Sequence, residues 1–227
     1  MKSLAVFAVV AAMMLWSRPA NATFYGSALP GMKEGAFAVG AALSDISRDF
    51  RSNTGIVSSD DYSRETLFGD YGLSEKSLLR LELGTADFGR FRGTEFALGY
   101  RREVGEPSKF GEKEFSLRKG VFVSFRTATL SAGVAEADFT QIDVGAGGQL
   151  EMNDILSIYM SGVFSRLEGS FSVILPSLPS LEVEFEGDSS IGLIGGFLAD
   201  LDPTIQLGGE LHFIFESGFA LFGRFLF

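Results

Sequence analysis

Apolar and polar residues alternate with a period of two in many short segments of this chain. Leu79, Leu81 and Leu83, for example, are separated by polar or small residues. A period of two indicates β-strands with one apolar and one polar face. The pattern predicts an all-β chain of ten strands, with eight or twelve left open because 115–131 and 170–187 are ambiguous. The ten segments are about 35–50, 63–73, 77–87, 94–104, 115–131, 139–151, 155–166, 189–201, 204–215 and 219–227.

The polar rows of these segments combine full charges with many glycines. Small and charged residues of this kind are expected inside a narrow membrane barrel, whereas a soluble barrel or sandwich places apolar side chains inside. We therefore predict a closed, antiparallel, up-and-down transmembrane β-barrel, with a soluble β-fold as the alternative. Both signs of charge occur in the predicted lumen, which favours ion pairs that close it. The predicted lumen residues are Asp70, Arg80, Glu82, Glu95, Arg101, Arg126, Asp143, Glu210, His212 and Arg224.

The first 22 residues have the features of a secretory signal peptide. A basic start at Lys2 precedes an apolar run from Leu4 to Trp16 and the small-residue site Ala20-Asn-Ala22. The run is too short for a membrane-spanning helix. We expect residues 1–22 to be removed and residues 23–227 to form one barrel domain.

The other end of the chain carries a second export signal. Phe219, Leu221, Gly223, Phe225 and Phe227 lie on one face of the last segment, which ends on an aromatic residue. This strand resembles the C-terminal signal of small Gram-negative outer-membrane β-barrel proteins. The resemblance implies location in the outer membrane, contact with its lipid, and recognition by the barrel-assembly machinery. It covers one strand directly.

A three-residue loop, 216–218, is predicted to join the last two strands. It would place Glu210 opposite Arg224 as an ion pair inside the barrel, and Phe213 opposite Leu221 outside. Aromatic residues at the strand ends would form girdles at the two membrane surfaces. The girdle residues are Tyr71, Tyr100 and Phe227 at one end, and Phe215 and Phe219 at the other.

Composition excludes several classes of function. Formal net charge is −10, and the loss of Lys2 and Arg18 with the signal peptide makes it more negative by two units. An acidic chain of this kind is not suited to nucleic-acid binding. The absence of cysteine excludes disulfides, thiolate metal sites and a cysteine nucleophile. We expect no metal and no cofactor; Asp60-Asp61 lacks the spacing of a calcium loop.

Three classes of function remain open. A charge-plugged barrel with a structural or surface-interaction role through its loops is the first. A small-molecule channel or receptor is the second, because the 170–187 hairpin carries an apolar row on each side of a Pro-rich tip. That row consists of Phe171, Val173, Leu175, Leu181, Val183 and Phe185.

An enzyme is the third class, because the single histidine, His212, follows Glu210 at a spacing of two residues. This arrangement resembles the acid-x-His dyad of the omptin outer-membrane proteases. The second, aspartate pair of omptins is not matched, and Ile214 stands where the lipid A deacylases have serine. A buried histidine that hydrogen-bonds to a neighbour is the simpler interpretation. No catalytic residue is assigned.

Overall fold

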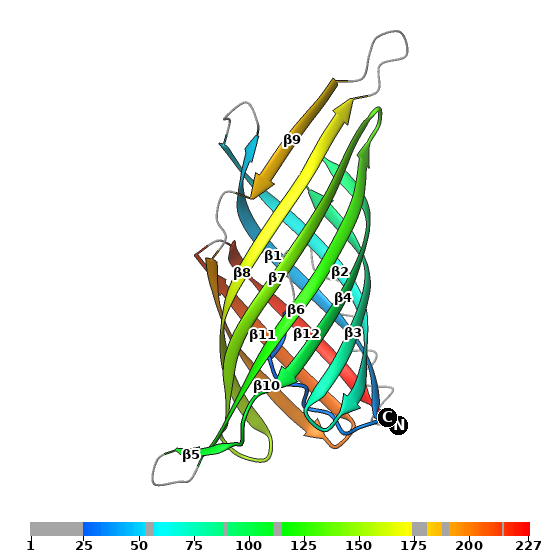
Figure 1. The fold of residues 1–227 in the computed structure, drawn as a ribbon. Helices are drawn as coiled ribbons and strands as arrows, with labels where there is room; N and C mark the ends of the chain where they lie inside the picture. The colour runs from blue at the N-terminus through cyan, green and yellow to red at the C-terminus, as the bar shows by residue number, and fades with distance from the viewer. Residues whose placement is uncertain are drawn as a thin grey trace.

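The computed structural model describes residues 25–52, 57–88, 90–110, 115–173, 181–187, 191–214 and 216–227. Their twelve strands form one antiparallel sheet, ten of whose strands close a barrel (Figure 1). This part of the chain contains no helix long and apolar enough to cross a bilayer. The wall strands are β1 (Phe37–Ser52), β2 (Val57–Ser74), β3 (Ser77–Phe88), β4 (Phe91–Glu103), β6 (Phe115–Ala132), β7 (Ala135–Glu151), β8 (Leu156–Val173), β10 (Ile191–Asp202), β11 (Ile205–Phe213) and β12 (Glu216–Leu226).

The barrel closes because the last strand pairs with the first. In the β12–β1 ladder, Phe225 lies opposite Val39 and Ser217 lies opposite Ser47. The prediction of a closed antiparallel barrel of ten strands is confirmed, and the ambiguous segment 115–131 is the single long strand β6. The short strand β5 (Ser108–Phe110) adds only to the start of β6.

A short strand completes the wall at its upper end, which is opposite the end that carries Phe227. Strand β9 (Leu181–Gly187) pairs with the top of β8, where Phe171 faces Val183, and with the top of β1, where Arg51 faces Glu186. It passes above β10, β11 and β12, which are shorter (Figure 1). Strands β1, β2 and β8 therefore continue beyond the predicted segments 35–50, 63–73 and 155–166.

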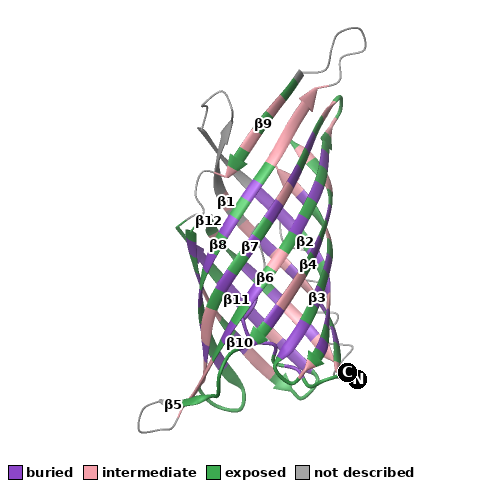
Figure 2. Ribbon diagram, viewed as in Figure 1, coloured by how far each residue is buried: buried purple, intermediate pink, exposed green. Residues whose placement is uncertain are grey.

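Side-chain burial follows the period of two around the barrel (Figure 2). On β8, Tyr159, Ser161 and Val163 are buried, whereas Ile158 and Met160, which alternate with them, are exposed. The interior therefore receives the polar rows, and the exterior is an apolar belt. An exterior of this kind suits lipid rather than water. Large exposed hydrophobic residues of the wall include Val39, Leu67, Leu81, Leu83, Leu98, Val123, Phe125, Ile142, Val144, Phe164, Phe197, Leu211 and Leu221.

Aromatic residues follow one level of the exterior near the lower end. Ladder partners run from Phe37 to Tyr71, from Tyr71 to Leu79 and from Leu79 to Tyr100. Phe227 is 78% exposed, and its backbone N–H donates to the carbonyl oxygen of Phe37 at 2.7 Å. The register thus places the three aromatic residues of the predicted lower girdle along one edge of the apolar belt.

The last hairpin differs from its predicted register. Glu210 lies opposite Ala220, and Arg224 lies opposite Gln206, so the predicted Glu210–Arg224 ion pair is wrong. Parity is correct, because odd-numbered residues still face odd-numbered residues and the apolar row stays outside. Strand β11 ends at Phe213 and β12 begins at Glu216, and Ile214 takes a positive φ of 88°.

Pairing with β1 accounts for this shift. Strand β12 begins at Glu216, opposite Arg48, and Gly218 lies opposite Ile46 in the same ladder. The residues predicted to form a loop are therefore strand residues. Phe213 does not face Leu221, since β12 places Phe219 opposite Leu211. Phe219 is 40% exposed on the exterior, and Phe215 lies outside the described residues.

Candidate functional site

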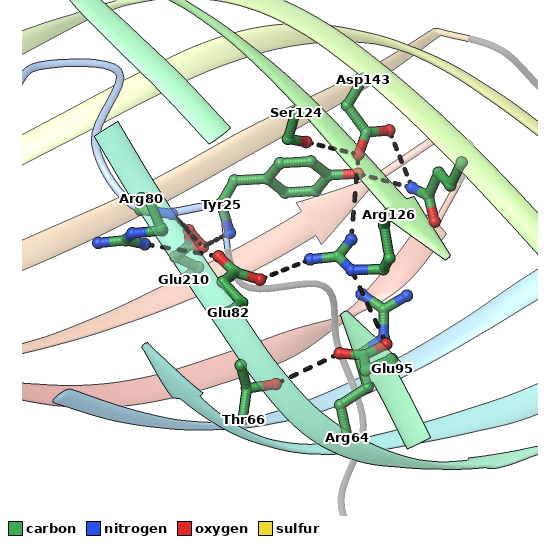
Figure 3. A network of polar contacts seen from close by, with 12 residues as sticks. Tyr25, Arg64, Thr66, Arg80, Glu82, Glu95, Ser124, Arg126, Asp143 and Glu210 are labelled. Atoms are coloured by element: carbon green, nitrogen blue, oxygen red, sulfur yellow. Dashed lines mark hydrogen bonds and ion pairs between the residues drawn. The ribbon is translucent and has the colours of Figure 1, made fainter. Parts of the chain in front are cut away.

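A network of buried ion pairs crosses the middle of the lumen (Figure 3). Arg126 on β6 donates to Glu82 on β3 at 2.9 Å and lies 3.8 Å from Glu95 on β4. Arg64 on β2 reaches the same Glu95 carboxylate at 2.9 Å. Their side chains are at most 8% exposed. Four strands are thus joined by charges across the interior, as the mixed signs of the polar rows predict.

Asp143 on β7 extends this network. One carboxylate oxygen accepts from the Gln141 amide at 2.8 Å, and the other accepts from the Ser124 hydroxyl at 3.1 Å. Arg126 lies 4.0 Å away, so its guanidinium is within ion-pair distance of three carboxylates. A buried cation surrounded in this way compensates the desolvation of several acids at once.

A second cluster lies nearer the lower end. Asp70 on β2 is fully buried and accepts two hydrogen bonds from Arg80 on β3, at 2.6 and 2.8 Å. Arg224 on β12 donates to the same carboxylate at 3.0 Å. Arg224 therefore finds its carboxylate on β2, two strands away, rather than on Glu210 of the adjacent β11.

The N-terminal segment 25–32 occupies the lumen beside these clusters, and the period-two pattern does not predict this. Tyr25, Ser27, Ala28, Leu29 and Met32 are all less than 9% exposed. Such burial is unusual for a segment that forms no strand or helix, because its backbone groups need partners. The lumen supplies those partners.

Two charged side chains hold the backbone of this segment from opposite sides. The carboxylate of Glu210 accepts the N–H groups of Tyr25, at 3.1 Å, and of Gly26. The guanidinium of Arg101 donates to the carbonyl oxygens of Ser27, at 2.9 Å, and of Tyr25. Glu210 therefore binds the backbone of residues 25 and 26 instead of forming the predicted ion pair with Arg224.

Side chains fix the position of the segment further. The Ser27 hydroxyl donates to the Gln149 amide oxygen at 2.7 Å. The ring of Tyr25 lies 5.7 Å from Phe122 and 5.5 Å from His212, centroid to centroid. Because these side chains come from three wall strands, the segment acts as an internal plug for the barrel. We refer to residues 25–32 as the plug.

His212 is buried beside this plug. Its Nε2 lies 3.7 Å from Glu210, whose two carboxylate oxygens already accept hydrogen bonds from the plug backbone. The Tyr25 ring covers the imidazole. The acid and histidine that suggested an omptin-like dyad are thus adjacent, but both are part of the contact with the plug. This environment favours the structural interpretation of His212.

Aromatic side chains fill the lumen above the charged network. Tyr62 links the two layers, because its hydroxyl donates to Glu95 at 3.1 Å and its ring lies 5.5 Å from Phe139. Higher up, the rings of Phe91 and Phe171 meet edge to face at 5.2 Å. Phe185 on β9 also packs against this cluster.

The apolar row of the 170–187 hairpin therefore faces inward. Phe171 and Val173 continue the inward row of β8. On β9, Val183 lies opposite Phe171, and Phe185 lies opposite Gly169 in the same inward row. The contacts show that the described part of this hairpin folds against its own barrel. Leu175 and the side chain of Leu181 lie outside the described part of the chain.

A cavity of about 1020 Å³ opens at the lower end, beside the plug. Its wall includes Arg80, Arg101 and Arg224, together with Gln149 and Gln206. Among the described residues, no group of three or more His, Cys, Asp or Glu side chains is arranged to hold a metal ion.

No protein-family model matches this chain, and no curated protein matches it in sequence. Among solved structures, it is similar to Ail, the attachment invasion locus protein of Yersinia pestis: 15% identity, 86% of this chain, 99% of that chain, TM-score 0.40. The outer membrane protein OprG of Pseudomonas aeruginosa gives 15% identity, 86% and 98% coverage, and a TM-score of 0.35. The outer membrane protease OmpT of Escherichia coli is 6% identical over 87% of this chain and 97% of that chain, with a TM-score of 0.43. At these values the similarities identify no family.

Proposed function

We propose that this chain is an integral outer-membrane barrel that is closed at rest and has a structural or surface-interaction role through its extracellular end. An apolar exterior around a charged interior supports insertion in a membrane. Cleavage after Ala22 and recognition of the last strand by the assembly machinery belong to the same proposal. The lower end then faces the periplasm and the upper end faces the outside.

One observation carries the closed state: the lumen is filled at successive levels by different means. Aromatic rings fill it above, at the Phe91–Phe171 contact, and ion pairs around Arg126 fill it in the middle. The plug fills it below, between Glu210 and Arg101. A hydrated ion has to displace buried, paired charges to pass, and separating a buried pair is costly.

Planar-bilayer recording of the refolded chain 23–227 tests this proposal. We expect a silent membrane, with circular dichroism and protease resistance of the same sample in vesicles showing that the barrel is folded and inserted. A matched variant that opens all three levels, by deletion of residues 25–34, Arg126→Ser with Glu82→Ser, and Phe91→Ser with Phe171→Ser, is expected to conduct. Steady, ion-selective openings of the unmodified chain would refute the closed state.

A second candidate, capture of a small apolar molecule at the extracellular mouth, is favoured by the inward-facing aromatic row. Phe91, Phe171 and Phe185 are only partly buried and come from three strands. Partly exposed aromatic side chains of this kind often mark a ligand contact.

Binding of anilinonaphthalene sulfonate to the barrel in lipid nanodiscs distinguishes this second candidate, with empty nanodiscs subtracted. Phe171→Ser is expected to weaken binding, and Phe164→Ser, which lies on the exterior of the same strand, is the control. Equal binding by both variants would exclude the mouth as the site.

A further inference from the structure

The periplasmic cavity has buried cations on its wall. Arg80, Arg101 and Arg224 are each at most 6% exposed as residues, yet all three contribute to the lining. They come from β3, β4 and β12, so the barrel closure brings them together. Burial of arginine is rare unless anionic or hydrogen-bonding groups compensate it.

Carboxylate compensation of these three cations is incomplete. Asp70 is shared by Arg80 and Arg224. Arg80 also lies 4.0 Å from Glu82, but that carboxylate has Arg126 at 2.9 Å. In the described residues, the hydrogen bonds of Arg101 go to two neutral carbonyl oxygens of the plug. The inner wall therefore has an excess of positive charge.

Four acids line the outer part of the cavity. Glu151 pairs with Arg118 at 3.1 Å, Asp200 accepts from Gln206 at 2.6 Å, and Asp202 accepts from the Thr204 hydroxyl at 2.7 Å. Asp154 lies in the exposed β7–β8 turn. Glu210 also acts on this wall, and its two carboxylate oxygens accept backbone N–H groups of the plug.

A donor on the inner wall is also unused. The Nε of Arg224 is buried and has no hydrogen-bond partner among the described residues. A guanidinium offers parallel N–H groups that match the two oxygens of a carboxylate or phosphate. Two such groups on one wall, with excess charge and a free donor, are suited to an oxyanion.

We propose that the periplasmic cavity binds the oxyanion group, carboxylate or phosphate, of a small molecule through Arg101 and Arg224. Its volume of about 1020 Å³ is at the upper end of the range for small-molecule sites, so the oxyanion is one end of a larger ligand. The acidic outer part of the cavity favours a neutral or cationic remainder. Entry is from the periplasm, and the site does not require the lumen to conduct.

Isothermal titration of the refolded barrel with inorganic phosphate, and separately with succinate, tests the site. An uncharged glucoside detergent is required, because phosphocholine detergents carry a competing phosphate, and sodium chloride at equal ionic strength is the blank. We expect saturable binding of at least one probe. Phosphate binding alone indicates a phosphate-bearing ligand, and succinate binding alone indicates a carboxylate-bearing one.

Arg101→Gln is the test variant, since its amide can still donate to the plug while the charge is lost. We expect affinity to fall at least tenfold. Arg102→Gln is the matched control, because Arg102 is the next residue and is exposed on the exterior; affinity should stay within twofold. Absence of saturable binding beyond chloride, or equal affinity in the two variants, overturns the proposal.

A measurement on the unmodified chain covers the case in which Arg101→Gln does not refold. Phenylglyoxal modifies accessible guanidinium groups, and peptide mass spectrometry locates the adducts. Phosphate or succinate should slow modification of Arg101 and Arg224 and leave Arg102 unchanged. Unchanged rates at Arg101 and Arg224 would count against the site.

Discussion

Replacement of Asp70 by asparagine probes the ion-pair cluster that joins the two ends of the barrel wall. Asp70 is fully buried and accepts three guanidinium hydrogen bonds, two from Arg80 and one from Arg224. Asparagine has nearly the same shape but no charge, and its NH₂ group cannot accept. Asp70→Asn therefore leaves two buried cations without their shared carboxylate while changing the packing little.

The size of the effect follows from the burial of the cluster. Removal of one partner from a buried pair costs about 3–5 kcal/mol in the free energy of unfolding. Arg80 and Arg224 also line the cavity at the lower end of the barrel, so water can partly replace the lost carboxylate. We therefore expect a loss of about 3 kcal/mol. With a urea dependence of about 2 kcal/mol per M, the unfolding midpoint falls by about 1.5 M.

Urea unfolding of the barrel in lipid vesicles, followed by circular dichroism, measures this change. Asp70→Glu keeps the charge and should recover part of the loss. The control is Glu106→Gln, which removes an exposed ion pair with Lys76 (2.6 Å) and should leave the midpoint unchanged. The hydrogen bond from Lys76 lowers the pKa of Glu106, but solvent screens this exposed ion pair, so that its loss changes the stability of the barrel little. A midpoint for Asp70→Asn equal to that of the unmodified barrel would refute the role of Asp70.

Two further predictions concern packing and pH. Gly145→Ala places a methyl group against the Phe122 ring and should destabilise the barrel by about 1–3 kcal/mol. Gly162→Ala is the control, because no heavy atom lies within 4 Å of its new carbon. Equal unfolding midpoints for the two variants would contradict the close packing at Gly145. Hydrogen bonds from Thr204 lower the pKa of Asp202 below its ordinary value of 3.8. Because the folded pKa is the lower one, this stabilisation is present above pH 4 or so and is lost as the pH falls through the folded value. The stability difference between the unmodified chain and Asp202→Asn should therefore vanish on acidification, and a difference that persists in acid would argue against it.

The period of two was sufficient to predict the wall and its two faces. Leu79, Leu81 and Leu83 are on the exterior, and Arg80 and Glu82 are buried inside, as their alternation predicts. Strand lengths were less predictable. Strands β1 and β8 extend beyond their predicted ends at residues 50 and 166, and no change in the period of the sequence marks where they stop. Their upper residues are ordered by β9, a partner that the pattern could not select.

Partners inside the lumen could not be read from the sequence. Arg224 bonds to Asp70 because β12 closes against β1, which brings β2 within reach, and Glu210 is taken by the backbone of the plug. The plug itself has neither alternation nor charge. The only available signal was a stretch of small and apolar residues between the expected cleavage site and the first strand.

Sequence by itself determined the barrel class, the inward and outward rows and the balance of charge in the lumen, because side chains on successive strand residues must point to opposite faces. Tertiary structure decided which charges meet, where β12 begins and what fills the lumen. These choices depend on register and closure, which join residues as distant as Asp70 and Arg224 or Tyr25 and Glu210. Local pattern fixes the face of a residue, whereas only closure of the sheet fixes its partner.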